Sequence, residues 1–334
     1  MTNVRPKTMS IGGATYDLFV RTSSELLNKN GEERAFELPL GEKVQIKEVI
    51  ETCGGGASNT SVGLARLGCN AGFCGVIGSD QWGEKLLANL KNENVNTDCA
   101  TVVEEEVSSF SIILSASSGE RVILYTPGTN VHLHDALFNK EAISNVDWVY
   151  LNHIQENSCV IQDDIIEMLA TKGPPYFTWN PGGCQLDAGV REKSHCTLIA
   201  HTNLVLLNTE EALKFTDTND VETAIKTLLE IGTKNVCVTQ GSKGTIASDG
   251  KQFYHCPILN GTKTIDTTGA GDAFGTGATW AIMTGRDLPT TLKAGTINAA
   301  SVVSAIGAQK GLLTDIEMIK RLETLHLDVD AHSF

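Results

Sequence analysis

The sequence predicts an α/β fold in which helices cover both faces of a parallel sheet. Short, continuously apolar stretches alternate along the chain with stretches of helical periodicity, and continuously apolar strands are typical of parallel sheets that are buried on both faces. Other stretches alternate polar with apolar residues, which indicates a separate sheet with one face in water. The 334 residues contain no internal repeat or low-complexity linker and suffice for one large α/β domain or two ordinary ones.

The predicted strands of the main sheet are separated by predicted helices. The first strand is at residues 9–13, and residues 15–20 continue it toward an edge. Further apolar strands are predicted at residues 71–77, 148–151, 176–179, 204–207 and 236–239, and helices at residues 82–91, 161–170 and 221–231. Ligands of such sheets bind beyond the carboxyl ends of the strands, so motifs that directly follow a strand are candidates for a site.

Four shorter stretches predict a small sheet that stands apart from the main core. They are residues 34–38 and 43–49, with Gly41 turning between them, and residues 109–116 and 121–125, joined by a hairpin signal at residues 117–120. Their alternating pattern gives the sheet one covered face. We expect this small sheet to cover a site.

Composition and charge argue against several function classes. With 26 basic and 40 acidic residues the net charge is -14, which is unsuited to nucleic acid and to anionic membranes. No apolar run approaches the roughly 18 residues of a spanning helix, and the N-terminus lacks a signal-peptide core, so we expect a cytoplasmic protein. The nine cysteines form no C-x-x-C motif, which predicts free thiols in a reducing compartment.

Residues 266–274, with the sequence Asp-Thr-Thr-Gly-Ala-Gly-Asp-Ala-Phe, form the most specific motif of the chain. The motif lies between the end of a predicted strand, residues 263–266, and a predicted buried helix, residues 273–283. Gly269 and Gly271 have no β-carbon, so the main chain and the free amides of the helix start can approach an anion. Asp272 lies in the first turn, where it can take a proton from an attacking hydroxyl. The motif therefore indicates phosphoryl transfer.

Two other interpretations of this motif stay open at this point. The helix dipole alone favours an aspartate at a helix start. Gly269, Gly271 and Gly275 also form a loose dinucleotide fingerprint, but that pattern belongs to the first βαβ unit of a fold. The acidic partner that it needs falls on Asp287, in a predicted turn. A nicotinamide dehydrogenase is therefore disfavoured.

A glycine-rich motif precedes a predicted apolar helix at residues 62–67. It contains Gly54, Gly55, Gly56 and Asn59. The glycines let a polyol approach the backbone, and Asn59 offers a donor and an acceptor to its hydroxyls. The alternative is an N-cap after a flexible turn.

Two more motifs directly follow predicted strands. Asn208 and Glu211 share a face at a helix start and suit magnesium bound through its water shell, although a capping box explains the same pair. Thr239, Gly241 and Gly244 can line nucleotide phosphates, or they form a plain hairpin turn into a strand at residues 245–248. The P-loop and protein-kinase motifs are absent from the sequence.

Together and in this order, these motifs resemble the ribokinase-like, or PfkB, family of carbohydrate and nucleoside kinases. The family signatures are similar to residues 54–68, to the G-x-D-x-x-G of residues 78–83, to the N-x-x-E of residues 208–211, to the T-x-G-x-x-G of residues 239–244 and to the D-T-x-G-A-G-D of residues 266–272. The resemblance covers nearly the whole chain.

The resemblance implies a Rossmann-like three-layer αβα sandwich. Residues 1–334 would form it as a single ribokinase-like domain, with a β-sheet lid drawn from about residues 15–51 and 108–126. It also implies transfer of the γ-phosphate of ATP to a hydroxyl of a sugar or sugar derivative, with Mg²⁺ as cofactor.

The resemblance further implies roles for individual residues. Asp272 matches the catalytic base, and the amides of Gly269, Ala270 and Gly271 match an anion hole. The residues matched to substrate hydroxyls are Asp17, Gly54, Gly55, Gly56 and Asn59. Those matched to ATP are Asn208, Thr239, Gly241, Gly244, Gly271 and Asn298. Asn208 and Glu211 match a Mg²⁺ site, and Asp266 and Thr268 match a monovalent-cation site that takes K⁺ in relatives.

The sequence leaves the acceptor open. A sugar or sugar acid is favoured by the polar set of Asp17, Gly55 and Asn59, and a nucleoside is the alternative. Aromatic residues that serve either as a stacking surface for a nucleoside or as core are Phe36, Phe110, Phe177 and Trp179. The loop at residues 180–183 points toward the site with either acceptor. A noncatalytic sugar sensor is a further alternative, which the intact Asp272 argues against. An exposed lid sheet offers a surface for a homodimer.

Overall fold

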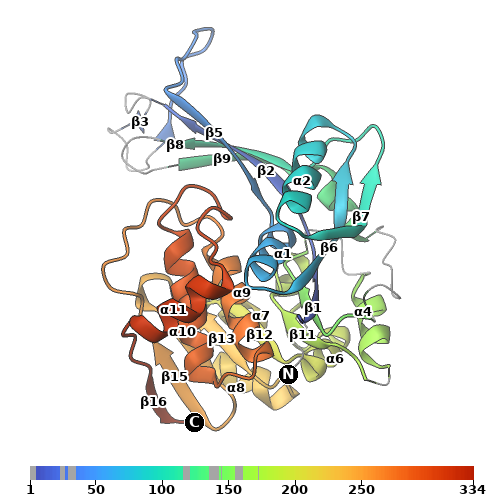
Figure 1. The fold of residues 1–334 in the computed structure, drawn as a ribbon, viewed down its shortest axis with the longest axis vertical. Coiled ribbons are helices and arrows are strands. Elements are labelled where there is room, and N and C mark those ends of the chain that lie inside the picture. The colour runs from blue at the N-terminus through green and yellow to red at the C-terminus, as the bar shows by residue number, and fades with distance from the viewer. Residues whose placement is uncertain are drawn as a thin grey trace.

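The computed structural model describes residues 5–22, 27–28, 35–115, 121–134, 143, 145–154, 161–171 and 173–334. Figure 1 shows a large body with a smaller sheet standing above it. Among the described residues, no helix has both the length and the apolar character needed to cross a membrane. The eight cysteines of the described part are all free, and Cys159 lies outside it.

The body is built on a sheet of ten strands in the order β16-β15-β14-β13-β12-β11-β10-β1-β6-β7. From β13 to β7 all neighbouring pairs are parallel, and from β13 to β16 they are antiparallel. The strands are β1 (Lys7–Ile11), β6 (Asn70–Gly78), β7 (Asn96–Val103), β10 (Trp148–Leu151), β11 (Tyr176–Trp179), β12 (Leu204–Asn208), β13 (Val236–Thr239), β14 (Thr245–Ser248), β15 (Gln252–Cys256) and β16 (Asp330–Ser333).

The predicted parallel sheet is therefore confirmed for the strands from β13 to β7. The alternative of a hairpin turn after residues 236–239 is confirmed as well, because β14 pairs antiparallel with β13. Strands β15 and β16, which were not predicted, extend this antiparallel edge. The reason for the antiparallel pairing lies in the connections. Only residues 240–244 separate β13 from β14, and a segment of this length can close a hairpin but cannot cross over to a parallel neighbour.

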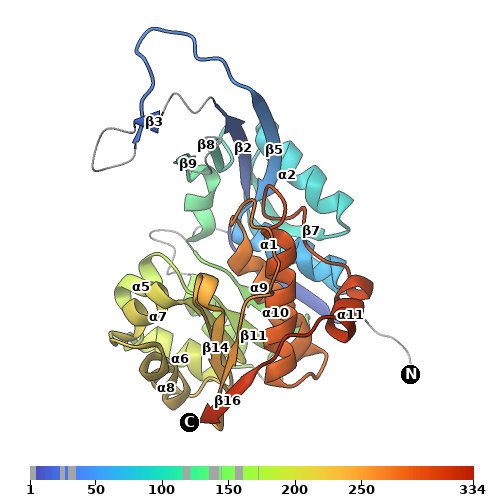
Figure 2. The same ribbon diagram turned by 90° about the vertical axis from the view of Figure 1, so that its left-hand side faces the viewer.

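Helices cover both faces of this sheet, which confirms the predicted α/β class. Along β12, Val205 and Leu207 pack on the side of α4, α6, α7 and α8, whereas Leu204 and Leu206 pack against α9 and α10. Figure 2 shows the strands between the two groups of helices. The helices are α1 (Gly56–Arg66), α2 (Gln81–Asn92), α4 (Ile161–Leu169), α5 (Cys184–Ala188), α6 (Lys193–His201), α7 (Thr209–Thr216), α8 (Val221–Ile231), α9 (Ala270–Met283), α10 (Leu288–Val302) and α11 (Asp315–Thr324), with 3₁₀ turns η2 (Gly128–His134) and η3 (Gly241–Lys243).

The smaller sheet, which we call the lid sheet, has the strand order β5-β2-β8-β9. Its strands are β2 (Thr15–Arg21), β5 (Glu48–Gly54), β8 (Phe110–Ser115) and β9 (Arg121–Thr126). Residues 15–20 thus belong to the lid sheet and do not continue the first strand of the body. Gly12 redirects the chain between the two sheets, with a φ of 141° that favours glycine.

Two of the four strands predicted for the lid sheet are misplaced. The prediction at residues 43–49 is wrong for most of its length, because the strand runs over Glu48–Gly54 and pairs with all of β2. Within the described residues 35–38, the strand is β4 (Ala35–Phe36), and it pairs with β3 (Leu27–Asn28) in a two-stranded sheet. The predicted hairpin turn at residues 117–120 and the position of Arg34 lie outside the described residues.

Three boundaries near the predicted site also differ. Helix α1 begins at Gly56 and not at residue 62, and α9 begins at Ala270 and not at residue 273. Residues 263–266 do not form a strand, because the amides of Ile265 and Asp266 donate to the carbonyl of Val303 in the loop after α10.

Candidate active site

A cavity of about 380 Å³ lies at the carboxyl edge of the parallel strands. Its walls include Gly13 after β1, His153 after β10, Asn180 after β11, Asn208 at the end of β12 and Thr239 at the end of β13. Five neighbouring strands therefore contribute to one cavity, where ligands of open α/β sheets bind. We call it the polar cavity.

The start of α9 forms the floor of the polar cavity. Gly269, the N-cap, has a left-handed conformation with φ 74° and ψ 7°, and a Cβ there would lie 2.4 Å from the Cβ of Ala308. The amide of Ala270 donates to the carbonyl of Thr267 at 3.2 Å. Among the predicted anion-hole donors, the amide of Ala270 therefore already has a hydrogen-bond acceptor. The amides of Gly271 and Asp272 lie in the first turn of α9, where the helix itself provides no acceptor, so they can donate to an anion.

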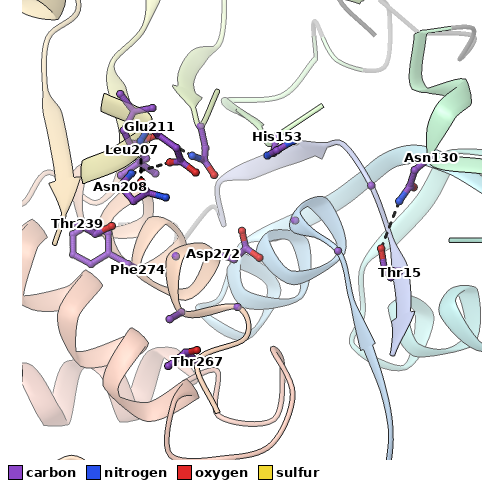
Figure 3. Close-up of a pocket in the computed structure, with 18 of the residues that line it drawn as sticks. Thr15, Asn130, His153, Leu207, Asn208, Glu211, Thr239, Thr267, Asp272 and Phe274 are labelled. Atoms are coloured by element: carbon purple, nitrogen blue, oxygen red, sulfur yellow. Dashed lines mark hydrogen bonds between the residues drawn. The ribbon is translucent and has the colours of Figure 1, made fainter. Parts of the chain in front are cut away.

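Asp272 projects from this turn into the polar cavity. Figure 3 shows it with Asn208, Thr239 and Phe274 on one side and Thr15 and Asn130 on the other. Burial raises the pKa of Asp272 from 3.8 to about 6; a hydrogen bond from Asn59 opposes the rise, and the charge of Glu211 adds to it. A carboxylate with a pKa near neutrality can take up a proton at physiological pH.

Asn59 is a neighbour of Asp272 and does not line the polar cavity. Its Nδ2 donates to Oδ2 of Asp272 at 2.8 Å, and it lies within α1, so the N-cap interpretation is wrong. Gln309 fixes this amide by donating to Asn59 Oδ1 at 3.2 Å and to Ser58 Oγ at 2.9 Å. Gln309 was not predicted, because it follows Asn59 by 250 residues and belongs to no motif.

Asp17, on the lid strand β2, does not line the polar cavity, but its carboxylate lies beside Gly54, which precedes the lining residue Gly55. Asp17 is 6% exposed, and its Oδ1 accepts a hydrogen bond of 2.6 Å from Ser111. Burial raises its pKa to about 6, the Ser111 bond opposes this, and the charge of Asp266 adds to it. Gly54 leaves room for this carboxylate, since a Cβ there would lie 2.3 Å from Asp17 Oδ2. Among the predicted substrate residues, Gly55 and Gly56 line the cavity itself.

Asn208 and Glu211 form a capping box at the start of α7, with bonds of 2.8 and 2.9 Å between their side chains and amides. The cap interpretation is thus confirmed, and both residues also line the polar cavity. Burial raises the pKa of Glu211, the bond from the Asn208 amide opposes this, and the charge of Glu210 adds to it.

The oxygen ligands that Glu211 and Asn208 offer suit a Mg²⁺ ion bound through its water molecules. The described lining of the polar cavity contains two carboxylates, Glu211 and Asp272, and neither lysine nor arginine. Burial lowers the pKa of His153, so it is neutral at pH 7 and cannot balance them. No group of three His, Cys, Asp or Glu side chains within the described chain could hold a metal directly. One carboxylate and one amide match an ion that keeps most of its waters.

A second cavity of about 460 Å³ lies on the other side of the α9 start. Thr239, Thr267, Ala270, Gly271 and Phe274 line both cavities. The remaining walls are mainly apolar and include Ile258, Leu259, Ala299, Ala300 and Val303, together with the predicted Gly241 and Gly244. We call it the apolar cavity. Its apolar walls were missed because they come from a loop and from one face of α10, which carry no motif.

Asn298 does not line either cavity, contrary to the predicted contact with ATP. It is fully buried, and its Nδ2 donates to the carbonyl of Ala273 at 2.8 Å. Its Oδ1 accepts from the amide of Leu313 at 3.1 Å. Both ends of the amide are therefore used to join α9, α10 and the loop that follows.

Asp266 and Thr268, the predicted K⁺ ligands, are paired with an arginine of the lid sheet. Arg121 Nη1 lies 2.5 Å from Asp266 Oδ1 and 3.2 Å from Thr268 Oγ1. Burial acts to raise the pKa of Asp266, but hydrogen bonds from Gly307 and Thr268 and the charge of Arg121 outweigh it, so the pKa is lowered. The side chains of Asp266 and Thr268 are therefore paired with a guanidinium in this structure.

The four aromatic residues considered for stacking do not line the polar cavity. Phe177 and Trp179 are fully buried in the core, and Phe110 packs against Trp82 at a centroid distance of 6.1 Å. Asn180, in the loop that was expected to point toward the site, does line it.

Comparison with known proteins agrees with this geometry. The chain matches the pfkB family carbohydrate kinase over residues 10–315. It is 29% identical over 260 residues to an uncharacterized sugar kinase of Archaeoglobus fulgidus, covering 77% of this chain and 100% of that protein. It is 27% identical over 286 residues to a nucleoside kinase of Methanocaldococcus jannaschii, covering 84% of this chain and 88% of the other.

A solved structure shows the same fold. The structure of Arabidopsis thaliana ribokinase complexed with ribose and ATP superposes with a TM-score of 0.75, at 21% identity, over 96% of this chain and 99% of the other. The match of the family to most of the chain, together with the α/β architecture, places the protein among phosphotransferases. The chain belongs to the pfkB family of carbohydrate kinases.

Proposed function

We propose that this protein transfers the γ-phosphoryl group of ATP to a hydroxyl of a sugar or sugar derivative. The observation that carries the proposal is the position of Asp272, a carboxylate with a pKa of about 6, at the helix start where the polar and apolar cavities meet. Adenosine occupies the apolar cavity, the phosphates cross the start of α9, and the acceptor hydroxyl lies beside Asp272.

The acceptor side of the polar cavity offers hydrogen bonds and little stacking surface. Thr15, Gly55 and Asn130 line it, and Asn130 Oδ1 is buried with no hydrogen-bond partner in the described part of the chain. An unpaired buried acceptor of this kind is costly unless a ligand donates to it. We place a sugar hydroxyl there, with the carboxylate of Asp17 beside Gly54 as a further acceptor. A nucleoside remains the second candidate because of the similarity to the nucleoside kinase of Methanocaldococcus jannaschii.

In the proposed reaction, the acceptor oxygen attacks the γ-phosphorus in line with the β–γ bridging oxygen. The new O–P bond forms, the bond to the bridging oxygen breaks, ADP leaves, and the hydroxyl proton passes to Asp272. The amides of Gly271 and Asp272 stabilise the charge on the transferring group. Asn208 and Glu211 would hold Mg²⁺ through its water ligands, and the ion would supply positive charge to the phosphates when bound. Closure of the lid sheet excludes water that would otherwise accept the phosphoryl group.

The acceptor class is tested by ADP formation from Mg·ATP with a panel of sugars, sugar acids and nucleosides. Sugar-dependent ADP formation would support the proposal, and nucleoside-dependent formation would favour the second candidate. Ligand binding without any acceptor-dependent turnover would favour the noncatalytic sensor.

Replacing Glu211 with glutamine should weaken the use of magnesium. Glutamine can still close the capping box, so α7 stays folded. Because the carboxylate is lost, the half-saturating Mg²⁺ concentration should rise and kcat/KM should fall by about 10- to 100-fold, as for outer-shell metal partners. Initial rates over a Mg²⁺ titration measure both quantities. The neighbouring exposed residue provides the matched control, Glu210→Gln; an unchanged Mg²⁺ dependence in Glu211→Gln would contradict the assignment.

We also propose a homodimer formed through the lid sheet. Strand β9 is an edge strand, and Val122, Ile123, Leu124 and Tyr125 on it are 39–51% exposed. Exposed apolar edges of this kind pair with another chain or aggregate. Light scattering should give about twice the monomer mass of 35.8 kDa, and Leu124→Lys should reduce it to one monomer. A wild-type mass of one monomer at micromolar concentration would rule the dimer out.

A further inference from the structure

Arg121, at the start of the lid strand β9, reaches the body of the molecule directly before the α9 turn. Its Nη1 contacts Asp266 and Thr268, and its Nη2 lies 3.1 Å from Thr267 Oγ1. These three residues lead without a gap into Gly269. One guanidinium of the lid sheet therefore contacts three consecutive residues of the loop that carries the proposed phosphate-binding turn.

Asp266, the partner of Arg121, is a buried and hydrogen-bonded carboxylate and not a surface group. Asp266 is 7% exposed, and its Oδ2 accepts from the amide of Gly307 at 3.0 Å. Its Oδ1 also accepts from the amide and the hydroxyl of Thr268, at 3.0 and 2.8 Å. A buried carboxylate with all these donors is held as an anion, and burying such a charge without a cation is strongly unfavourable.

Arg121 is the cation that balances this carboxylate within the described chain. The other lid arginine of the same region, Arg21, lies in the same cross-strand row through Ser115 and lines the same small cavity. Arg21 is instead paired with Glu48 of the adjacent strand at 3.0 Å. The two arginines thus share a face of the lid sheet, and only Arg121 bridges the lid sheet to the body through an ion pair with Asp266.

We propose that Arg121 is a positioning residue that supplies, from within the chain, the positive charge that a monovalent cation would otherwise supply at Asp266 and Thr268. The guanidinium fixes the loop that carries the phosphate-binding amides, and it does so only when the lid sheet is closed. Turnover is therefore independent of K⁺, and closure of the lid orders the anion hole. This inference rests on the proposed kinase function.

The test compares the wild type with Arg121→Gln and Arg121→Ala, and with Arg21→Ala as the matched control. Initial rates are measured in KCl and in tetramethylammonium chloride at equal ionic strength. We expect the wild type and Arg21→Ala to be equally active in both salts. Arg121→Gln should lose about 10- to 100-fold in kcat, with the acceptor KM changed less than twofold, since a supporting contact is removed and not a substrate contact.

Arg121→Ala leaves the oxygens of Asp266 and Thr268 free for an ion, so K⁺ should restore its activity several-fold over tetramethylammonium. Three results would overturn the inference. The first is a several-fold increase of the wild-type rate by K⁺. The second is a rate of Arg121→Ala that does not respond to K⁺. The third is a rise in the acceptor KM of Arg121→Gln at unchanged kcat. The last would make Arg121 a binding residue for an anionic acceptor.

Thermal unfolding in the same two salts separates this inference from the proposed function. K⁺ should raise the melting temperature of Arg121→Ala over its value in tetramethylammonium and should leave the wild type unchanged. This comparison needs no acceptor, so failure of every acceptor in the panel would refute the kinase proposal and leave the melting test of Arg121 intact. A K⁺-specific rise in the wild type would show that the site binds the ion despite Arg121.

Discussion

Replacing Asp272 with asparagine should remove turnover while both ligands still bind. Loss of a positioned base costs about 10²- to 10⁴-fold in rate. An asparagine oxygen can still accept the 2.8 Å hydrogen bond from Asn59, so the geometry of the α9 turn is preserved. Initial rates give the loss of kcat, and calorimetric titration with a non-hydrolysable ATP analogue gives the binding. Asp328→Asn, at an exposed position, is the control, and near-normal kcat in Asp272→Asn would refute the base assignment.

The same substitution should make the folded protein more stable at pH 8. The folded-state pKa of Asp272 is raised from 3.8 to about 6, so the folded protein favours the protonated carboxyl. The contribution of this proton to the free energy of unfolding is fully present below pH 3.8 and is lost as the pH rises through 6. Above that pH the buried charge costs up to about 3 kcal/mol, which the neutral amide avoids. A higher melting temperature together with lost turnover is typical of a residue retained for function.

The pH profile provides an independent check of the same residue. Asp272 must be ionised to accept a proton, so kcat/KM of the wild type should fall as the pH drops through about 6 and level off above it. The pKa of Asp17 is also raised to about 6, so this residue needs a control. Asp17→Asn should weaken acceptor binding, but its kcat/KM should still fall as the pH drops through about 6. A flat profile from pH 5 to 8 would argue against a carboxylate base.

The second large effect concerns the two glycines of the α9 turn, which should respond in opposite ways. A Cβ on Gly271 would meet no atom within 4 Å, and this residue lines both cavities. Gly271→Ala should therefore fold normally, with a gain of about 0.5–1 kcal/mol in helix stability. The new methyl group displaces the phosphates from the helix start, and a displacement of about 1 Å can cost about 100-fold in kcat/KM.

Gly269→Ala should instead damage the fold. Its φ of 74° is unfavourable for alanine, and the new Cβ would lie 2.4 Å from Ala308 Cβ. Left-handed strain and overpacking together should cost about 2–4 kcal/mol of unfolding free energy. Urea denaturation and initial rates of the two variants measure the contrast. Full activity in Gly271→Ala would show that phosphate does not bind against this turn.

The parallel strands of the main sheet were predictable because each has a recognisable local sequence pattern. Buried parallel strands are continuously apolar, and the stretch at residues 148–151 was predicted with the boundaries of β10. The lid sheet was harder, since its strands are covered on one face only and the alternation at residues 43–49 is equally compatible with an exposed loop. Glu48–Gly54 is a strand because it pairs with all of β2, which no local pattern reveals.

The candidate site also contains residues that a local motif predicts and residues that no local motif predicts. Asp272, Gly271, Thr239 and Glu211 were predicted because each belongs to a short motif, and the structure brings them to the walls of the polar cavity or the apolar cavity. Gln309 and Arg121 act through long-range contacts with motif residues. Such contacts depend on how the lid sheet and the loops meet in space, and one sequence does not encode that in any local pattern.

The most direct test of the role of Asp272 is phosphorus NMR of a reaction that contains Mg·ATP, the acceptor identified in the panel and either the wild type or Asp272→Asn. We predict that the wild type forms a phosphomonoester of the acceptor mole for mole with ADP, and that the variant forms neither at a comparable rate. ADP accompanied only by inorganic phosphate, or equal phosphomonoester formation by the variant, would contradict the claim that Asp272 activates an acceptor hydroxyl for phosphoryl transfer.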